Sequence, residues 1–243
     1  MFEPHWQVTL ADARASGRIT WQNRTYNFSD AKFYAEKNWG AALPAKWYWT
    51  QCNSFEGFDN LSVTAGGGVR GIPFGGKESL GMVAIHYNNT FFEATPWTGD
   101  MSWNVTKWGS WELTGRSIYE EPFFEAKVSY TLRNDQDGLV FRAPTPDEGM
   151  VYFCRDTFEA MTTLTLWELE WDKGLRQFVR KESPPLIDGA TSLQGGAELG
   201  GGPWWDTWTA TSKVSKPVLV LLRSPLLLQK LRRRIRGRRN NET

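Results

Sequence analysis

The sequence predicts an all-β protein whose antiparallel strands close as a barrel or stack as a sandwich. Segments of alternating apolar and polar residues recur, separated by Gly, Pro and Asp about every ten residues. The 243 residues include 14 Trp, 14 Phe, 7 Tyr, 23 Gly and 12 Pro, a composition that suits short strands joined by turns. No stretch before residue 215 has convincing helical periodicity.

The composition fits one large domain or two small ones, with ample residues for a core. Its 40% hydrophobic and 23% charged residues are ordinary for a globular protein. The two cysteines, Cys52 and Cys154, could pair, but they are too few for a disulfide framework and favour a reducing compartment. Two His and two Cys without close ligand spacing predict no metal site.

The N-terminal residues 5–31 are expected to form strands. Gly17–Trp21 and Arg24–Phe28 flank Gln22-Asn23, which is a plausible hairpin turn. The first residues resemble neither a signal peptide nor a transit peptide. We therefore expect either a cytosolic protein or a chain that lacks its true N-terminus.

The stretch Tyr34–Gly57 is the most informative part of the chain. Glu36–Gly40 is expected to be a polar loop, and residues 47–55 alternate as an extended strand. One face of this strand would carry three aromatics and two amides, a set that suits either a cavity or a sandwich core whose amides bond to backbone: Trp47, Trp49, Gln51, Asn53 and Phe55. The other face would carry Tyr48, Thr50, Cys52 and Ser54.

A triple glycine, Gly66-Gly67-Gly68, follows the alternating segment Leu61–Ala65. Such a run could cradle phosphate, but no Lys-Ser/Thr follows it and no helix is signalled, which excludes a P-loop. We expect a bulge or a close approach of another backbone instead.

The remaining strands follow at short intervals. Met82–Tyr87 and Thr90–Trp97 flank Asn88-Asn89, a second hairpin signal because Asn tolerates positive φ. Further alternating segments predict strands at Trp103–Trp108, Trp111–Ser117, Phe123–Leu132, Leu139–Ala143 and Thr163–Trp171.

The C-terminal segment, residues 215–243, differs in character. Pro217–Leu228 is apolar apart from a break at Pro225, and Lys230–Arg239 is strongly basic. Residues 223–243 carry eight Lys/Arg and one Glu, so the chain's net charge of +1 leaves −6 on residues 1–222. A basic amphipathic segment over residues 223–239 predicts contact with a membrane or lipid-droplet surface, or else a disordered solubilising tail. The acidic body disfavours nucleic acid, and no segment has the length of a transmembrane helix.

Several motifs, in order, resemble the tocopherol cyclase family over roughly residues 4–210. They are Glu36-Lys-Asn-Trp-Gly40, Pro44-x-Lys-Trp-x-Trp-x-Gln-Cys-Asn-x-Phe-Glu-Gly57, Thr64-Ala-Gly-Gly-Gly68, His86-Tyr87, Pro96-Trp97, Trp108-Gly109, Arg142-Ala-Pro-Thr145, Cys154-Arg-Asp156 and Gly200-Gly-Gly-Pro-Trp204. The resemblance implies a lipocalin-like barrel, which agrees with the all-β prediction.

The resemblance further implies closure of the chromanol ring of vitamin E from a prenylated benzoquinol, without a cofactor. It implies a chloroplast location, at plastoglobules or thylakoids. Family members carry an additional N-terminal half, and this chain begins about where that half would end. We therefore expect residues 1–214 to form a tocopherol-cyclase-like β domain, either one barrel or part of a first barrel with a complete second one. Whether such a shortened chain is active stays open.

The implied reaction needs an acid for the alkene, an acceptor for the phenol proton and a cavity that folds the prenyl tail. Glu36, Asp156 and His86 are the candidates for proton transfer. Each has a structural alternative: an ion pair of Glu36 with Lys37, an ion pair of Asp156 with Arg155, and a core position for His86. The candidates for substrate binding are Lys37, Asn38, Trp39, Trp47, Trp49, Gln51, Asn53, Glu56 and Glu93.

Three functions are compatible with these residues. The first is the ring-closing enzyme. The second is a non-catalytic, lipocalin-like protein that binds prenylquinols or other isoprenoids. The third is a structural protein at a membrane surface, held there by the basic segment.

Overall fold

The computed structural model describes residues 5–72, 76–132, 138–145, 147–202 and 205–212. Within these ranges the chain forms strands and no helix, which confirms the all-β prediction. The predicted basic segment, residues 215–243, and Trp204 of the last family motif lie outside the described residues.

The strands follow one another in short succession along the chain. They are β1 (His5–Trp21), β2 (Arg24–Trp39), β3 (Trp47–Cys52), β4 (Leu61–Ile72), β5 (Gly76–Tyr87), β6 (Thr90–Ala94), β7 (Gly99–Val105), β8 (Ser110–Ser117), β9 (Phe124–Thr131), β10 (Leu139–Thr145), β11 (Gly149–Asp172), β12 (Gln177–Arg180), β13 (Ile187–Gly200) and β14 (Trp208–Thr211).

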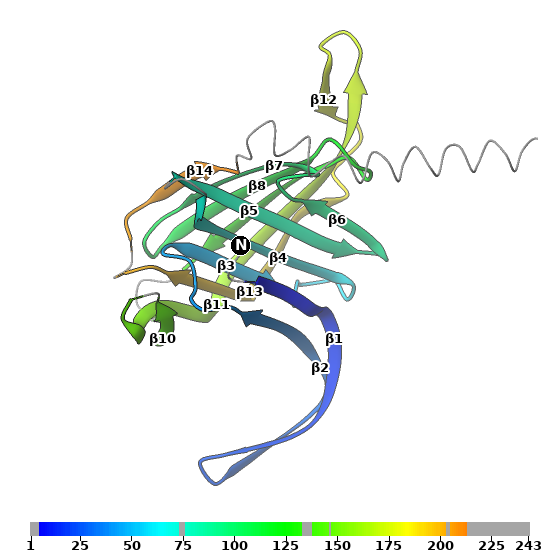
Figure 1. Cartoon of the computed structure of the whole chain (residues 1–243). Helices are drawn as coiled ribbons and strands as arrows, with labels where there is room; N and C mark the ends of the chain where they lie inside the picture. Colours follow the sequence, from blue (N-terminus) through cyan, green and yellow to red (C-terminus); the bar gives the residue numbers. More distant parts are fainter. Residues whose placement is uncertain (1–4, 73–75, 133–137, 146, 203–204, 213–243) are drawn as a thin grey trace, which may run out of the picture. The chain divides into compact units, whose positions relative to one another are not determined.

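Most strands join one large antiparallel sheet in the order β14-β7-β8-β9-β11-β13-β3-β4-β5-β6, with β10 and β12 on β11. The sheet curls over, so that β5 and β6 pack against β7 and β8 (Figure 1). At this contact a Cβ on Gly115 would lie 2.2 Å from Cγ1 of Val83, which leaves room for no larger residue. The curled sheet encloses the core on its inner face.

β1 and β2 form a separate two-stranded ribbon. Its turn, Gln22-Asn23, has φ values of 46° and 62°, and the second predicted turn, Asn88-Asn89, has 47° and 62°. Asn accepts this left-handed conformation at low cost, and two successive residues with positive φ match the twist of a hairpin. Both predicted hairpins are confirmed.

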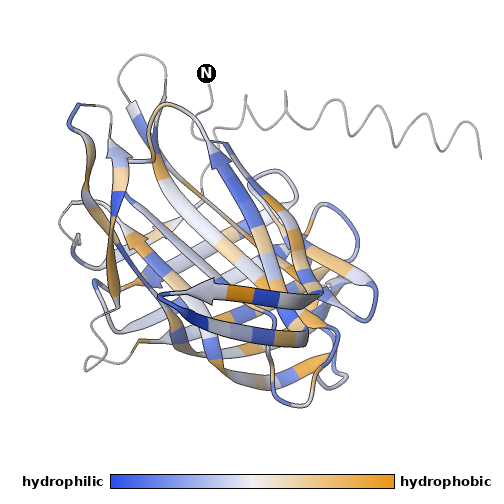
Figure 2. Ribbon diagram, turned by 90° about the horizontal axis from the view of Figure 1, so that it is seen from below, coloured by the Kyte–Doolittle hydropathy of each residue, from blue (hydrophilic) through white to orange (hydrophobic). Residues whose placement is uncertain are grey.

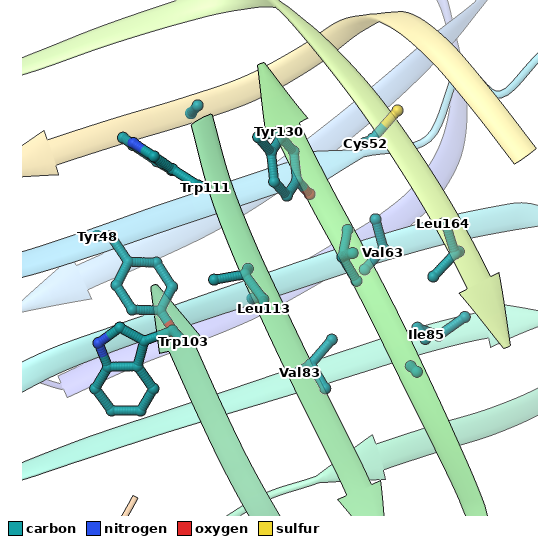
Figure 3. Packing of buried hydrophobic residues seen from close by; sticks show 14 of the residues in the cluster. Tyr48, Cys52, Val63, Val83, Ile85, Trp103, Trp111, Leu113, Tyr130 and Leu164 are labelled. Carbon is teal, nitrogen blue, oxygen red and sulfur yellow. The ribbon is translucent and has the colours of Figure 1, made fainter. Parts of the chain in front are cut away.

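The inner face of the large sheet is the hydrophobic core (Figure 3). Apolar and polar residues alternate along many of its strands, as the colours of Figure 2 show, because successive side chains point to opposite faces. In β3 the inward residues are Tyr48, Thr50 and Cys52, all buried. Tyr48 packs edge-on or tilted against Trp103 and Trp208, with ring centroids 5.5 and 5.9 Å away.

Three local predictions need correction. Glu36–Trp39 is not a loop but the end of β2, because this segment pairs with residues 5–8 of β1. Phe55 does not share the face of Trp49; it follows the end of β3 and is buried in the core. At the triple glycine the expected bulge or close second backbone is replaced by a close approach of side chains. A Cβ on Gly67 would lie 2.5 Å from the Tyr48 ring, and β4 passes through the glycines without a bulge.

Candidate active site

One end of the β1–β2 ribbon lies against the outer face of the large sheet, over β4 (Figure 1). The ring of Trp6 rests on bare backbone there, since a Cβ on Gly66 would lie 3.1 Å from it. Just beyond β3, Nδ2 of Asn53 donates a hydrogen bond to the carbonyl of Phe33 at 3.1 Å. The outward side chains of β3 are therefore covered by a ribbon from the start of the chain.

The carboxylate of Glu36 joins this ribbon to β3. Its Oε2 accepts the indole N–H of Trp6 at 2.8 Å and that of Trp49 at 2.7 Å, and the Tyr34 hydroxyl donates to the same oxygen. Nδ2 of Asn38 donates to Oε1 at 3.2 Å. Burial, followed by the contact with Glu36, raises the pKa of Tyr34, so that the phenol keeps its proton and acts as a donor.

A second pair of carboxyl groups lies beside Trp49. Asp156 of β11 is directly opposite Glu198 of β13, and Glu198 is opposite Trp49 of β3. Cross-strand partners share a face, so these three side chains form a row on the outer face. Oε1 of Glu198 accepts the indole N–H of Trp47 at 2.6 Å.

Both of these carboxyl groups hold their protons more tightly than usual. Burial raises the pKa of Glu198 to about 7, the Trp47 hydrogen bond opposes the shift, and the charges of Asp156 and Glu36 add to it. Burial raises the pKa of Asp156 to about 6. The site thus contains carboxyl groups that exchange protons near neutral pH.

Glycines make room for the tryptophans around Glu198. Gly196 and Gly200 stand two residues to either side of it on the same strand face. A Cβ on Gly200 would lie 1.9 Å from the Trp47 ring, and one on Gly196 would lie 3.1 Å from the Trp49 ring. The pattern Gly-x-Glu-x-Gly therefore places one carboxyl group between two indoles.

Aromatic rings line the rest of the row. The Trp49 ring lies 5.9 Å from Tyr34 and 6.4 Å from Phe158, centroid to centroid. Trp47 packs with Ala143 and Cys154 in a small cluster where β10 covers β11. Aromatic faces attract cations, by about 0.5–2 kcal/mol each.

The two amides of the aromatic strand differ in what they bind. Asn53 holds the ribbon through the bond to Phe33 described above. Oε1 of Gln51 is buried and has no hydrogen-bond partner among the described residues. A buried acceptor without a partner costs about 1–3 kcal/mol, so a ligand hydroxyl that donates to Gln51 would relieve that cost.

The structure also bears on the ion pair with Arg155 that the sequence left as the alternative role of Asp156. Arg155 lies on the opposite side of β11 from Asp156, since neighbouring residues of a strand alternate. Its guanidinium carbon is 4.1 Å from the centroid of the Trp108 ring. Burial dominates the electrostatics of Asp156 and favours its protonated form.

Other candidates from the sequence lie farther from the Glu36–Glu198 region. Lys37 sits 4.9 Å above the ring of Trp39, which is 48% exposed at the end of β2. Glu56 is an exposed turn residue whose backbone N–H bonds to Thr191. His86 and Glu93 share the outer face but lie on β5 and β6, two and three strands from β3.

Sequence reasoning missed Glu198, Trp6 and Tyr34. Glu198 stands alone in a glycine-dense stretch, where its flanking glycines at even spacing were the available signal. Trp6 and Tyr34 gave no such signal, because their role depends on how the ribbon folds onto the sheet. Among the described residues no group of three or more His, Cys, Asp or Glu could hold a metal ion. In the same residues no helix is long and apolar enough to cross a membrane.

The sequence was compared with protein families, with curated proteins and with solved structures. Residues 1–201 match the family model described as tocopherol cyclase-like. The chain is 38% identical over 232 residues to the chloroplastic tocopherol cyclase of Zea mays, covering 95% of this chain and 46% of the relative. It is 39% identical over 213 residues to the probable chloroplastic tocopherol cyclase of Oryza sativa subsp. japonica, covering 87% of this chain and 42% of the relative. The chain thus spans about half the length of the curated relatives it matches. No solved structure matches it significantly.

Proposed function

The chain belongs to the tocopherol cyclase-like family, and from that premise we propose that it closes the chromanol ring of a prenylated benzoquinol. The substrate class is a quinol that carries a phytyl tail. The reaction adds the phenolic O–H across the trisubstituted double bond of the tail within one molecule, which makes the protein an isomerase.

Such a reaction makes three demands on a site. A proton must reach the alkene, which calls for a carboxyl group that is still protonated near neutral pH. The tertiary cation that forms must be stabilised and kept from water, which aromatic walls provide. The tail must be folded back onto the ring, an orientation effect that is worth up to roughly 7–11 kcal/mol in the best intramolecular cases.

One observation carries the proposal: the carboxyl groups of Asp156 and Glu198 lie with Trp47 and Trp49 on the outer face of the sheet, and Glu36 of the ribbon is bonded to Trp49 of the same face. Burial raises the pKa of Glu198 to about 7 and that of Asp156 to about 6, so proton donors are available there. Trp47 and Trp49 form walls beside them. The buried Gln51 oxygen is an acceptor suited to a quinol hydroxyl.

Glu36 has a positioning role in this proposal. Four donors converge on its carboxylate, and two of them are indoles from different sheets. These bonds engage both oxygens of Glu36, and they fix the ribbon over the reacting groups. We therefore assign proton transfer to the carboxyl groups beside Trp47 and Trp49 instead.

The location and partners follow from the same premise. The chloroplastic relatives support a chloroplast location. Within the chloroplast, the proposed sites are the surfaces of plastoglobules or thylakoids, whose lipid would dissolve a prenylquinol. Contact of residues 223–239 with an anionic lipid surface stays a prediction from their charge.

The decisive experiment is to incubate the purified chain with a reduced phytyl-benzoquinol and to measure chromanol. Turnover in D₂O should place one deuterium on the carbon that was protonated. Tight binding without conversion would instead support a prenylquinol-binding protein. Neither binding nor conversion, with liposome association retained, would support a structural role at a membrane surface.

A further inference from the structure

We infer that Glu198, facing Asp156 across β11 and β13 and hydrogen bonded to the Trp47 indole, delivers the proton that starts ring closure, while Asp156 takes up the phenol proton. This assignment rests on the proposed function. It concerns a residue that the sequence motifs do not single out.

The backbone register makes the two carboxyl groups a pair. Cys154 to Thr157 pair with Gly200 to Ala197 without a bulge, which sets Asp156 opposite Glu198. Cβ atoms of such partners lie about 4.5–5.5 Å apart, so the two carboxyl groups can approach within hydrogen-bond reach of one substrate. The alternating neighbours Thr157 and Ala197 belong to the other face.

The surroundings of Glu198 leave one of its oxygens for chemistry. The Trp47 indole occupies Oε1, which fixes the carboxyl group against the sheet, and Oε2 accepts no hydrogen bond from the residues that the structure describes. The space above Gly196 and Gly200 is filled by the Trp49 and Trp47 rings, which hold the Glu198 carboxyl group between two indoles. Both Glu198 and Asp156 are only partly buried, so a ligand can reach them.

Among the described residues, the titratable groups that act on Glu198 are all acidic. Asp156 and the thiol of Cys154 face it from β11, and Glu36 faces it from β2, while β3 presents the neutral indoles of Trp47 and Trp49. The pKa of Glu198 is raised to about 7 and that of Asp156 to about 6, with burial as the first cause of each shift. Facing carboxyl groups titrate as a pair, so between these values the pair holds about one proton.

That single proton is enough for the reaction. Glu198 gives its proton to the less substituted alkene carbon, the π bond becomes a C–H bond, and a tertiary cation forms. The phenol oxygen attacks the cation to make the C–O bond, and its proton passes to the Asp156 carboxylate. Transfer of this proton from Asp156 to Glu198 resets the pair, and the whole sequence is a redox-neutral isomerisation.

The test uses the full chain with reduced phytyl-benzoquinol and compares Glu198→Gln with Glu168→Gln. The glutamine at position 198 keeps the shape and an oxygen that accepts from Trp47, but it carries no transferable proton. We expect kcat to fall by about 10²–10⁴-fold, with substrate binding retained, whereas Glu168→Gln, a surface residue paired with Lys181, should leave kcat unchanged. An active wild type with an equally active Glu198→Gln variant would overturn the inference and leave the proposed function standing.

A measurement without turnover protects the test against a folding defect in the variant. In the wild-type chain, ¹³C NMR of the side-chain carboxyl groups should show Glu198 and Asp156 titrating together between about pH 6 and 7. If the wild-type chain forms no chromanol, the proposed function itself is contradicted. Titration of Glu198 at the ordinary value of a glutamate would remove the proton-donor role.

Discussion

The two faces of the sheet around β3 differ in chemistry although they are built from the same strands. The inner face carries Tyr48 and Cys52, which pack into the core, and no Asp or Glu is among the buried residues of the described part of the chain. The outer face carries Trp47 and Trp49, whose indoles donate to Glu198 and Glu36. One face therefore stabilises the fold by apolar burial, whereas the other holds titratable groups beneath a separate ribbon. The alternation of a strand is enough to keep these two roles one residue apart.

Truncation of neighbouring aromatic residues on opposite faces tests whether the two faces have different roles. Tyr48→Ala should lower the free energy of unfolding by about 3–5 kcal/mol, because it leaves a cavity in the core. Trp49→Ala, on the partly exposed face, should cost only about 1–2 kcal/mol but abolish most chromanol formation. Chemical denaturation and turnover of the two variants measure both effects. Equal losses of stability would mean that the faces do not divide the roles.

Removing the carboxylate that fastens the ribbon should have the next largest effect. Glu36→Ala leaves two indole N–H groups without their acceptor and should cost about 2–3 kcal/mol, since hydrogen bonds to charged groups are the strong ones. Hydrogen exchange should increase in residues 5–39 and stay unchanged in β7 and β8. Uniformly faster exchange would show that Glu36 supports the whole fold rather than the ribbon.

A methyl group at Gly200 probes the space beside Glu198. Gly200→Ala would place a Cβ 1.9 Å from the Trp47 ring, so the indole must shift, and overpacking of this kind costs about 1–3 kcal/mol. Gly71→Ala is the matched control on β4, since a Cβ there meets nothing within 4 Å. Thermal unfolding should separate the two variants. If Gly200→Ala unfolds at the same temperature as Gly71→Ala, the Trp47 ring does not pack closely against Gly200.

The smallest effect concerns pH and stability. A carboxyl group whose folded pKa is raised binds more protons in the folded state, so the free energy of unfolding falls as pH rises through the window between its two pKa values. For Glu198 that window runs from the value of an unfolded glutamate to about 7. Glu198→Gln should flatten this slope in denaturation curves taken across the window. An unchanged slope would assign the pH dependence to other groups.

The sequence allowed the fold class, both Asn-containing turns and the division of Trp47–Gln51 into two faces to be predicted, because these depend on local pattern. It could not show which face of β3 is inside, since aromatics occur on both. It also could not place Asp156 opposite Glu198, because that register pairs residues that are 42 positions apart in the chain. Glu36–Trp39 looked like a loop because its polar residues alternate poorly, yet pairing with β1 makes it a strand.

Hydrogen–deuterium exchange of the whole chain, with and without reduced phytyl-benzoquinol, tests most directly whether the ligand binds the outer face. The ribbon covers that face, whereas β7, β8 and β9 belong to the curled part of the sheet whose inner side lines the core. We expect slower exchange in residues 5–39 and no change in β7, β8 and β9. Protection of β7, β8 and β9 with an unchanged ribbon would place the ligand inside the curled sheet and contradict binding at the outer face.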